Sequence, residues 1–91
     1  MNKGELVDKV SEKAGVTKKQ ADAVLTATLE AIVEAVSEGE KVTLVGFGSF
    51  ERRDRAAREG RNPKTGDKME IKATRVPAFS AGKLFKDKVA P

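Results

Sequence analysis

The chain contains no cysteine, histidine, tryptophan or tyrosine among its 91 residues, and these absences exclude several kinds of function. Without cysteine there is no disulfide framework and no thiolate zinc site. Without histidine the chain lacks the commonest metal ligand and the usual general base. We therefore expect no enzyme, and no cofactor, metal or small-molecule substrate.

Long apolar runs are also absent. None approaches the roughly 20 residues that span a bilayer, and "MNKGELVDKV" lacks the apolar segment of a signal peptide. The sequence therefore indicates a soluble, intracellular protein with no membrane partner. Its length predicts one small domain with a modest core.

Positive charge is concentrated in one part of the chain. In residues 51–76, nine Lys or Arg outnumber five Asp or Glu, whereas residues 1–50 carry a net charge of −2. Residues 77–91 add a net +2. This asymmetry predicts a polyanionic partner that contacts mainly one region of the molecule.

The first half of the chain predicts two antiparallel helices. Each opens on the residues of a capping box, Asn2 with Glu5 and Thr17 with Gln20. Apolar residues then recur at helical spacing, and each segment ends at a glycine.

From Lys41 the apolar period changes to two, which predicts strands. "KVTLVGFGSF" alternates and turns at the glycines from Gly46 to Gly48. A phosphate-binding loop would need a helix directly after these glycines, whereas "SFERRDR" continues as a strand. The segment is therefore interpreted as a strand turn.

Residues 51–76 predict a long two-stranded hairpin with too few apolar side chains to be stable by itself. Arg53 and Arg55 share a face of its first limb, but Arg58 is out of step by one residue. A bulge at Ala56 and Ala57 would return Arg58 to that face. We expect this hairpin to be ordered by a partner.

The remainder of the chain is small for an independent core. Its tail "SAGKLFKDKVAP" predicts a short helix with Leu84, Phe85 and Val89 turned inward. About 65 residues remain without the hairpin, which would make a monomer marginal. We therefore expect an obligate, intertwined homodimer. The predicted dimer-core residues are Leu29, Leu44, Phe47, Phe50 and Phe79.

The hairpin tip "GRNPKTG", residues 60–66, combines turn formers with an apolar ring at Pro63. Two basic ribbons, each with an apolar tip, suit a protein that binds the minor groove of DNA. Arg and Lys would neutralise phosphates, while a rigid proline could wedge between base pairs and kink the duplex.

These motifs carry a family resemblance over essentially the whole chain. "GFGSFERRDRAAREGRNPKTG" and "VPAFSAGKLFKDKV" resemble the HU and integration host factor family of bacterial DNA-binding proteins. The resemblance implies a homodimer with a saddle-shaped sheet, two DNA-embracing arms and Pro63 as the intercalating residue, located in the cytoplasmic nucleoid. Ala81, where integration host factor commonly has proline, and the ending at Pro91 favour the HU branch.

The expected fold is therefore α+β: two N-terminal helices, a three-stranded antiparallel sheet with a long β-ribbon arm, and a short C-terminal helix. Within this single domain, residues 1–50 form a mainly helical dimerisation body, 51–76 the DNA-binding arm, and 77–91 the last strand end and helix. The family resemblance implies DNA contacts from Arg53, Arg55, Arg58, Arg61, Asn62, Pro63 and Lys64 on the arm, and from Lys3, Gly46, Ser80 and Lys83 on the body. The basic cluster adds Lys72 and Arg75 to the predicted DNA-binding residues of the arm.

Three alternatives stay open at this point. A sequence-specific bending subunit like integration host factor is possible, although the minor groove chiefly separates A·T from G·C. An RNA-binding protein is possible, although all four phenylalanines lie at core-like positions rather than on a stacking platform. An enzyme using Glu34 and Glu38 is disfavoured, because no nucleophile, base or metal-ligand cluster accompanies this helix-spaced pair.

Overall fold

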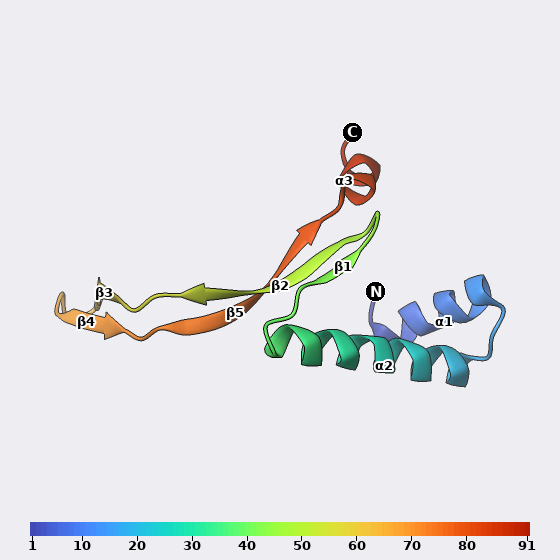
Figure 1. Ribbon diagram of the computed structural model, residues 1–91, viewed down its shortest axis with the longest axis horizontal. Coiled ribbons are helices and arrows are strands. Elements are labelled where there is room, and N and C mark those ends of the chain that lie inside the picture. The colour runs from blue at the N-terminus through green and yellow to red at the C-terminus, as the bar shows by residue number, and fades with distance from the viewer. The chain divides into compact units, whose positions relative to one another are not determined.

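The computed structural model describes residues 1–91 and contains three helices and five strands (Figure 1). Along the chain these are α1 (Lys3–Ala14), α2 (Lys18–Ser37), β1 (Val42–Leu44), β2 (Gly48–Arg55), β3 (Arg58–Arg61), β4 (Lys68–Ile71), β5 (Thr74–Ala81) and α3 (Lys83–Val89). The predicted α+β architecture is confirmed. The chain divides into two compact units, Met1–Glu34 and Ala35–Pro91.

Both predicted helix starts are present in the first unit. Asn2 caps α1, and its side chain accepts a hydrogen bond of 2.9 Å from the backbone N–H of Glu5. Thr17 and Gln20 form a reciprocal capping box, with bonds of 3.0 and 3.1 Å between each side chain and the other backbone N–H. The local sequence therefore fixes where both helices begin.

Ion pairs across the two helices show that they run antiparallel. Lys3, at the start of α1, lies 3.6 Å from Asp22, whereas Asp8, further along α1, lies 3.4 Å from Lys18 at the start of α2. Val7 and Ala21 are the buried apolar side chains of this unit. None of the three helices of the protein is long and apolar enough to cross a membrane.

The second unit is built on a three-stranded antiparallel sheet with the order β1-β2-β5. The β1–β2 turn closes through a 3.0 Å bond from the Phe47 N–H to the Leu44 carbonyl. Val42 lies opposite Phe50, and Phe50 lies opposite Phe79. Beyond Phe50, β2 and β5 continue as a two-stranded ribbon, because β1 pairs no further.

The far part of the ribbon is a second two-stranded sheet, β3–β4, in which the predicted bulge is wrong. Arg55 pairs with Thr74 and Arg58 pairs with Ile71, so two residues separate the ladders on each limb. A bulge needs an extra residue on one limb only. The ladder is interrupted symmetrically, and no added residue returns Arg58 to the face of Arg53.

Four phenylalanine rings form the apolar centre of this unit. The centroids of Phe50 and Phe79 are 4.8 Å apart, and Phe47 lies 5.4 Å from Phe85 and 5.5 Å from Phe79. Gly48 permits this packing, since a Cβ there would lie 2.5 Å from the Ser80 carbonyl oxygen and 2.6 Å from the Phe79 ring.

Much apolar surface remains exposed in the single chain. Val7, Ala21 and Val36 are its only buried hydrophobic residues. Leu84, Phe85 and Val89 of α3, which were predicted to turn inward, are 68%, 38% and 71% exposed in the single chain. The helical period identifies the apolar face of α3, but no other part of the same chain packs against that face closely enough to bury it.

Of the predicted dimer-core residues, Phe50 is half-buried within one chain. The other four remain exposed: Leu29, Leu44, Phe47 and Phe79.

Candidate nucleic-acid interface

The arm, formed by the ribbon beyond Phe50, ends in a tight loop between β3 and β4. The backbone N–H of Asn62 donates to the Asp67 carbonyl (2.8 Å), and that of Gly66 donates to the Asn62 carbonyl (2.7 Å). The Asn62 side chain accepts a 2.9 Å bond from the backbone N–H of Lys64. Pro63 has no N–H to satisfy and is exposed. Asn62 thus closes the loop, and Pro63 forms its apolar tip.

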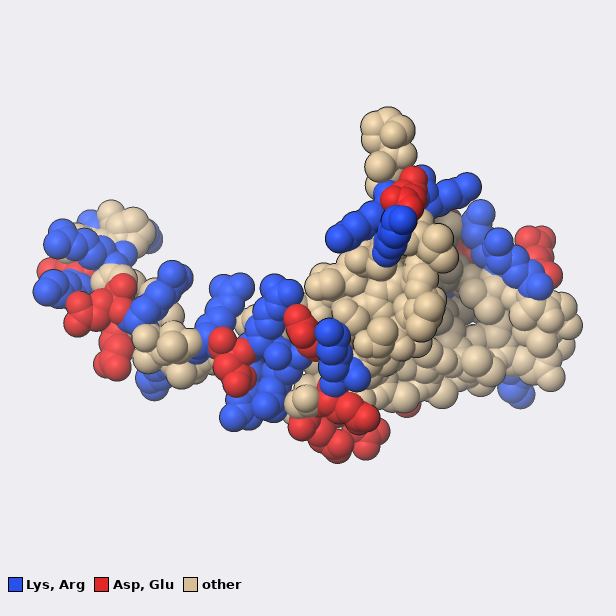
Figure 2. Space-filling model, turned by 45° about the horizontal axis from the view of Figure 1, so that its top comes forward, with Lys and Arg blue, Asp and Glu red and all other residues tan.

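Six cations of the arm have no ion-pair partner within 4.0 Å, and all six are exposed. They are Arg55, Arg58, Arg61, Lys64, Lys68 and Lys72. Figure 2 shows blue side chains along the whole length of the arm. Unpaired, solvated cations on a narrow ribbon are well suited to a polyanion, because no internal partner has to be displaced.

The other three arm cations, which lie where the arm leaves the three-stranded sheet, have ion-pair partners. They are Arg52, Arg53 and Arg75. Arg53 bonds Glu51 of the same strand through two guanidinium nitrogens, each at 3.2 Å. Arg75 lies 3.5 Å from Asp54, its neighbour across the ladder. Arg53 and Arg75 therefore sit in the predicted region but carry local partners in the free protein.

Arg52 has a structural role that its position in a basic run did not reveal. Its Nη1 donates a 3.4 Å bond to the carbonyl of Ser37, the last residue of α2, and its Nε lies 3.7 Å from Asp54. The side chain is only 27% exposed. A cation at a helix C-terminus complements the helix dipole, so Arg52 ties the root of the arm to the end of α2.

The predicted body residues lie in both compact units. Lys3, in the first unit, donates a 2.7 Å bond to the Thr26 hydroxyl besides its pairing with Asp22. In the second unit, Gly46 lies in the β1–β2 turn, Ser80 on β5 and Lys83 at the first position of α3. The structure thus brings the last three onto one unit and leaves Lys3 on the other.

A row of hydroxyl side chains crosses the three-stranded sheet beside Ser80. Thr43 of β1 lies opposite Ser49 of β2, and Ser49 lies opposite Ser80 of β5. Residues paired in this way share one face of a sheet. The sequence analysis singled out only Ser80 of these three residues, because the row depends on the register of all three strands.

The family model for bacterial DNA-binding proteins matches residues 1–90 of this sequence. The chain belongs to the bacterial DNA-binding protein family. Within this family, DNA-binding protein HU of Nostoc sp. strain PCC 7120 is 82% identical over 91 residues, covering 100% of this chain and 97% of that protein. The resemblance stated from sequence motifs is confirmed.

Solved structures of this bacterial DNA-binding family share the fold. A cocrystal structure of Anabaena HU with DNA gives a TM-score of 0.92 at 82% identity, covering 100% of this chain and 99% of that one. HU from Thermotoga maritima gives 0.70 at 40% identity, covering 99% and 100%. The curated relatives are named for DNA binding rather than for a catalysed reaction.

Proposed function

We propose that this protein is a histone-like protein of the bacterial nucleoid that binds double-stranded DNA through the minor groove with little sequence specificity, bending and compacting it. The observation that carries the proposal is the arm, where six unpaired cations flank an exposed proline. Phosphate contacts of this kind are independent of sequence. The relatives named DNA-binding protein HU, and the Anabaena HU structure that contains DNA, support the same function.

The working unit is a homodimer. One chain exposes large apolar side chains on both units, including Leu29 and Val33 on α2 and Phe47 and Phe79 beside the sheet. A chain of this size has little other core, so a second copy covering these residues supplies the missing burial. Two arms then act together on one duplex, which raises the effective concentration of the second arm once the first has bound.

Pro63 acts as the wedge at each arm tip. It is exposed and apolar, and the hydrogen bonds of the loop run through Asn62 instead of through Pro63. An apolar ring between two base pairs unstacks them and kinks the duplex, at a cost of a few kcal/mol that additional contacts offset.

The division of the chain follows from this function: residues 1–50 serve mainly dimerisation, 51–76 form the DNA-binding arm, and 77–91 complete the sheet and the aromatic centre. The protein acts without a cofactor and without catalysing a reaction. DNA contacts come from the arm residues predicted above and from Lys3, Gly46, Ser80 and Lys83 on the body.

Gel-shift titrations with linear, nicked and mismatched DNA duplexes, over a series of salt concentrations, test this proposal. We expect binding to all three that weakens steeply with salt, because phosphate contacts release counterions. A double-stranded RNA of the same length is the control. Equal or tighter binding to the RNA would contradict the proposal, as would strong preference for one DNA sequence.

The wedge is tested by Pro63→Ala, which removes most of the ring but keeps every charge. We expect less bending of intact duplex, measured by energy transfer between its ends, with an unchanged dependence of affinity on salt. The deficit should shrink on nicked DNA, which is already flexible. Undiminished bending of intact duplex by a folded variant would exclude the wedge.

A further inference from the structure

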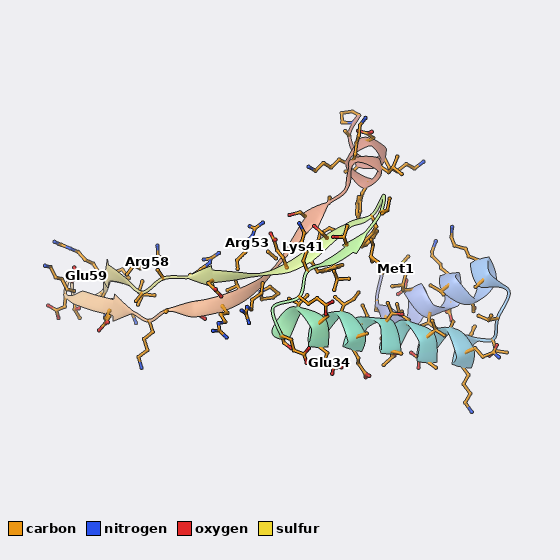
Figure 3. The ribbon with its side chains drawn as sticks, viewed as in Figure 1. Met1, Glu34, Lys41, Arg53, Arg58 and Glu59 are labelled. Carbon is orange, nitrogen blue, oxygen red and sulfur yellow. The ribbon has the colours of Figure 1, made fainter.

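The β3–β4 part of the arm has two chemically different faces. Because directly opposite residues of an antiparallel pair share a face, the register places Arg58, Gly60, Met69 and Ile71 on one side and Glu59, Glu70, Arg61 and Lys68 on the other. We name these the apolar arm face and the charged arm face. Figure 3 shows Arg58 and Glu59, consecutive residues of β3 that belong to different faces.

The charged arm face contains an unfavourable pair. Glu59 lies directly opposite Glu70 in the ladder, and neither carboxylate has a salt-bridge partner. Like charges in directly opposite positions destabilise a two-stranded ribbon. This arm is already short of apolar contacts, so the pair does not serve its stability in the free protein.

The apolar arm face carries no carboxylate. A Cβ at Gly60 would lie 3.0 Å from Cδ1 of Ile71 and 3.9 Å from Cγ of Met69, so these two side chains cover the glycine. Ile71 nevertheless remains 37% exposed and Met69 46% exposed, because β3 and β4 form a separate two-stranded sheet that leaves this face open. Arg58 supplies the only charge on this face.

We propose that the apolar arm face enters the minor groove and that the Glu59–Glu70 pair selects this orientation by turning the charged arm face to solvent. This inference rests on the proposed DNA-binding function and assigns which side of the arm performs it. If the ribbon were inverted, both carboxylates would face a groove lined by phosphates, with loss of hydration and direct repulsion.

Cations on the outward face can still serve binding. Arg61 and Lys68 carry long flexible stems, so their charged ends can reach sideways to the phosphates that border the groove. The shorter Glu59 and Glu70 side chains remain outside. The pair therefore costs some stability in the free arm and gives the bound arm a defined orientation.

Single introduced thiols test the orientation, because the chain has no cysteine of its own. Met69→Cys and Lys68→Cys place a thiol at adjacent positions of β4 on opposite faces. Each variant is alkylated with N-ethylmaleimide with and without intact duplex, at a DNA concentration about 100 times its own measured Kd. Only about one chain in 100 is then free, so a fully covered thiol should react up to roughly 100-fold more slowly.

We expect strong protection at position 69 and much weaker protection at position 68. DNA raises the negative potential around both thiols, so the comparison between the two variants cancels that general effect. Equal protection, or greater protection at position 68, would overturn the orientation while leaving DNA binding intact. Absence of any gel shift with the unaltered protein would instead refute the proposed function and this inference with it.

The role of the acidic pair is tested by adding Glu59→Gln and Glu70→Gln to Lys68→Cys. Glutamine keeps the shape and removes both charges, so the inverted orientation loses its main penalty. We expect protection at position 68 to rise toward the value at position 69. Unchanged protection at position 68 would show that the pair does not select the face.

Discussion

The division of arm cations into paired and unpaired residues can be tested with two arginines of the same strand. Arg55 has no ion-pair partner, whereas Arg52 bonds the Ser37 carbonyl and approaches Asp54. Arg55→Gln should therefore remove a phosphate contact and leave the free protein almost as stable. Exposed substitutions without local partners usually change the free energy of unfolding by no more than about 0.5 kcal/mol.

The expected change in the salt dependence of DNA affinity follows from counterion release. Each phosphate contact contributes about 0.9 to the slope of log K against log salt, and a homodimer carries Arg55 twice. Arg55→Gln should flatten the slope by about 1.8. Between 50 and 200 mM salt, the unaltered protein should then lose about tenfold more affinity than the variant.

Arg52→Gln is the matched control, with the same charge change three residues earlier on β2. It should lower the free energy of unfolding by about 1 kcal/mol, because a charged hydrogen bond of marginal length and a weak ion pair are lost. Its salt slope should change little. Both effects are measured by thermal melts and by gel-shift titrations over a salt series. Equal flattening of the slope by the two variants would refute the distinction between paired and unpaired cations.

Three further predictions concern the fold. The melting temperature should rise with protein concentration, because folding and dimerisation are linked; a stably folded monomer at low micromolar concentration in sedimentation would contradict this. Phe47→Ala should destabilise by about 3–5 kcal/mol, as loss of a core ring does, whereas a near-normal melt would place this ring outside the core. Gly48→Ala should cost about 1–3 kcal/mol, because the new Cβ meets the Ser80 carbonyl at 2.5 Å. The control Gly4→Ala, where a Cβ meets only Asn2 at 3.5 Å, should be neutral or stabilising in a melt.

Local chemistry explains which parts of the fold the sequence predicts well. The helix starts at Asn2 and Thr17 depend on side chains that bond backbone groups three residues away, so they are visible in a short window. The β1–β2 turn is similarly local. The basic composition of residues 51–76 and the contiguous tip motif located the arm and Pro63, and the family resemblance agreed with them.

Features that depend on two distant segments were not predictable in the same way. The bulge expected at Ala56 and Ala57 considered one limb of the arm, whereas the register depends on the residue count of both limbs. The sequence does not show that Glu59 lies opposite Glu70, because that pairing also depends on the register of both limbs. Arg52 stands in a run of arginines, and only the fold shows that it reaches the end of α2.

The distribution of charge pairs along the arm suits a ribbon that must be partly ordered before it meets DNA. At the root, Asp54 lies close to both Arg52 and Arg75, and Glu51 pairs with Arg53, so the cations there already have local partners. Farther out, cations lack such partners, and a two-stranded ribbon is only marginally stable in water. Phosphates can supply the missing partners at the moment of binding. Because those partners are common to every DNA sequence, the same arrangement that orders the arm also keeps its sequence specificity low.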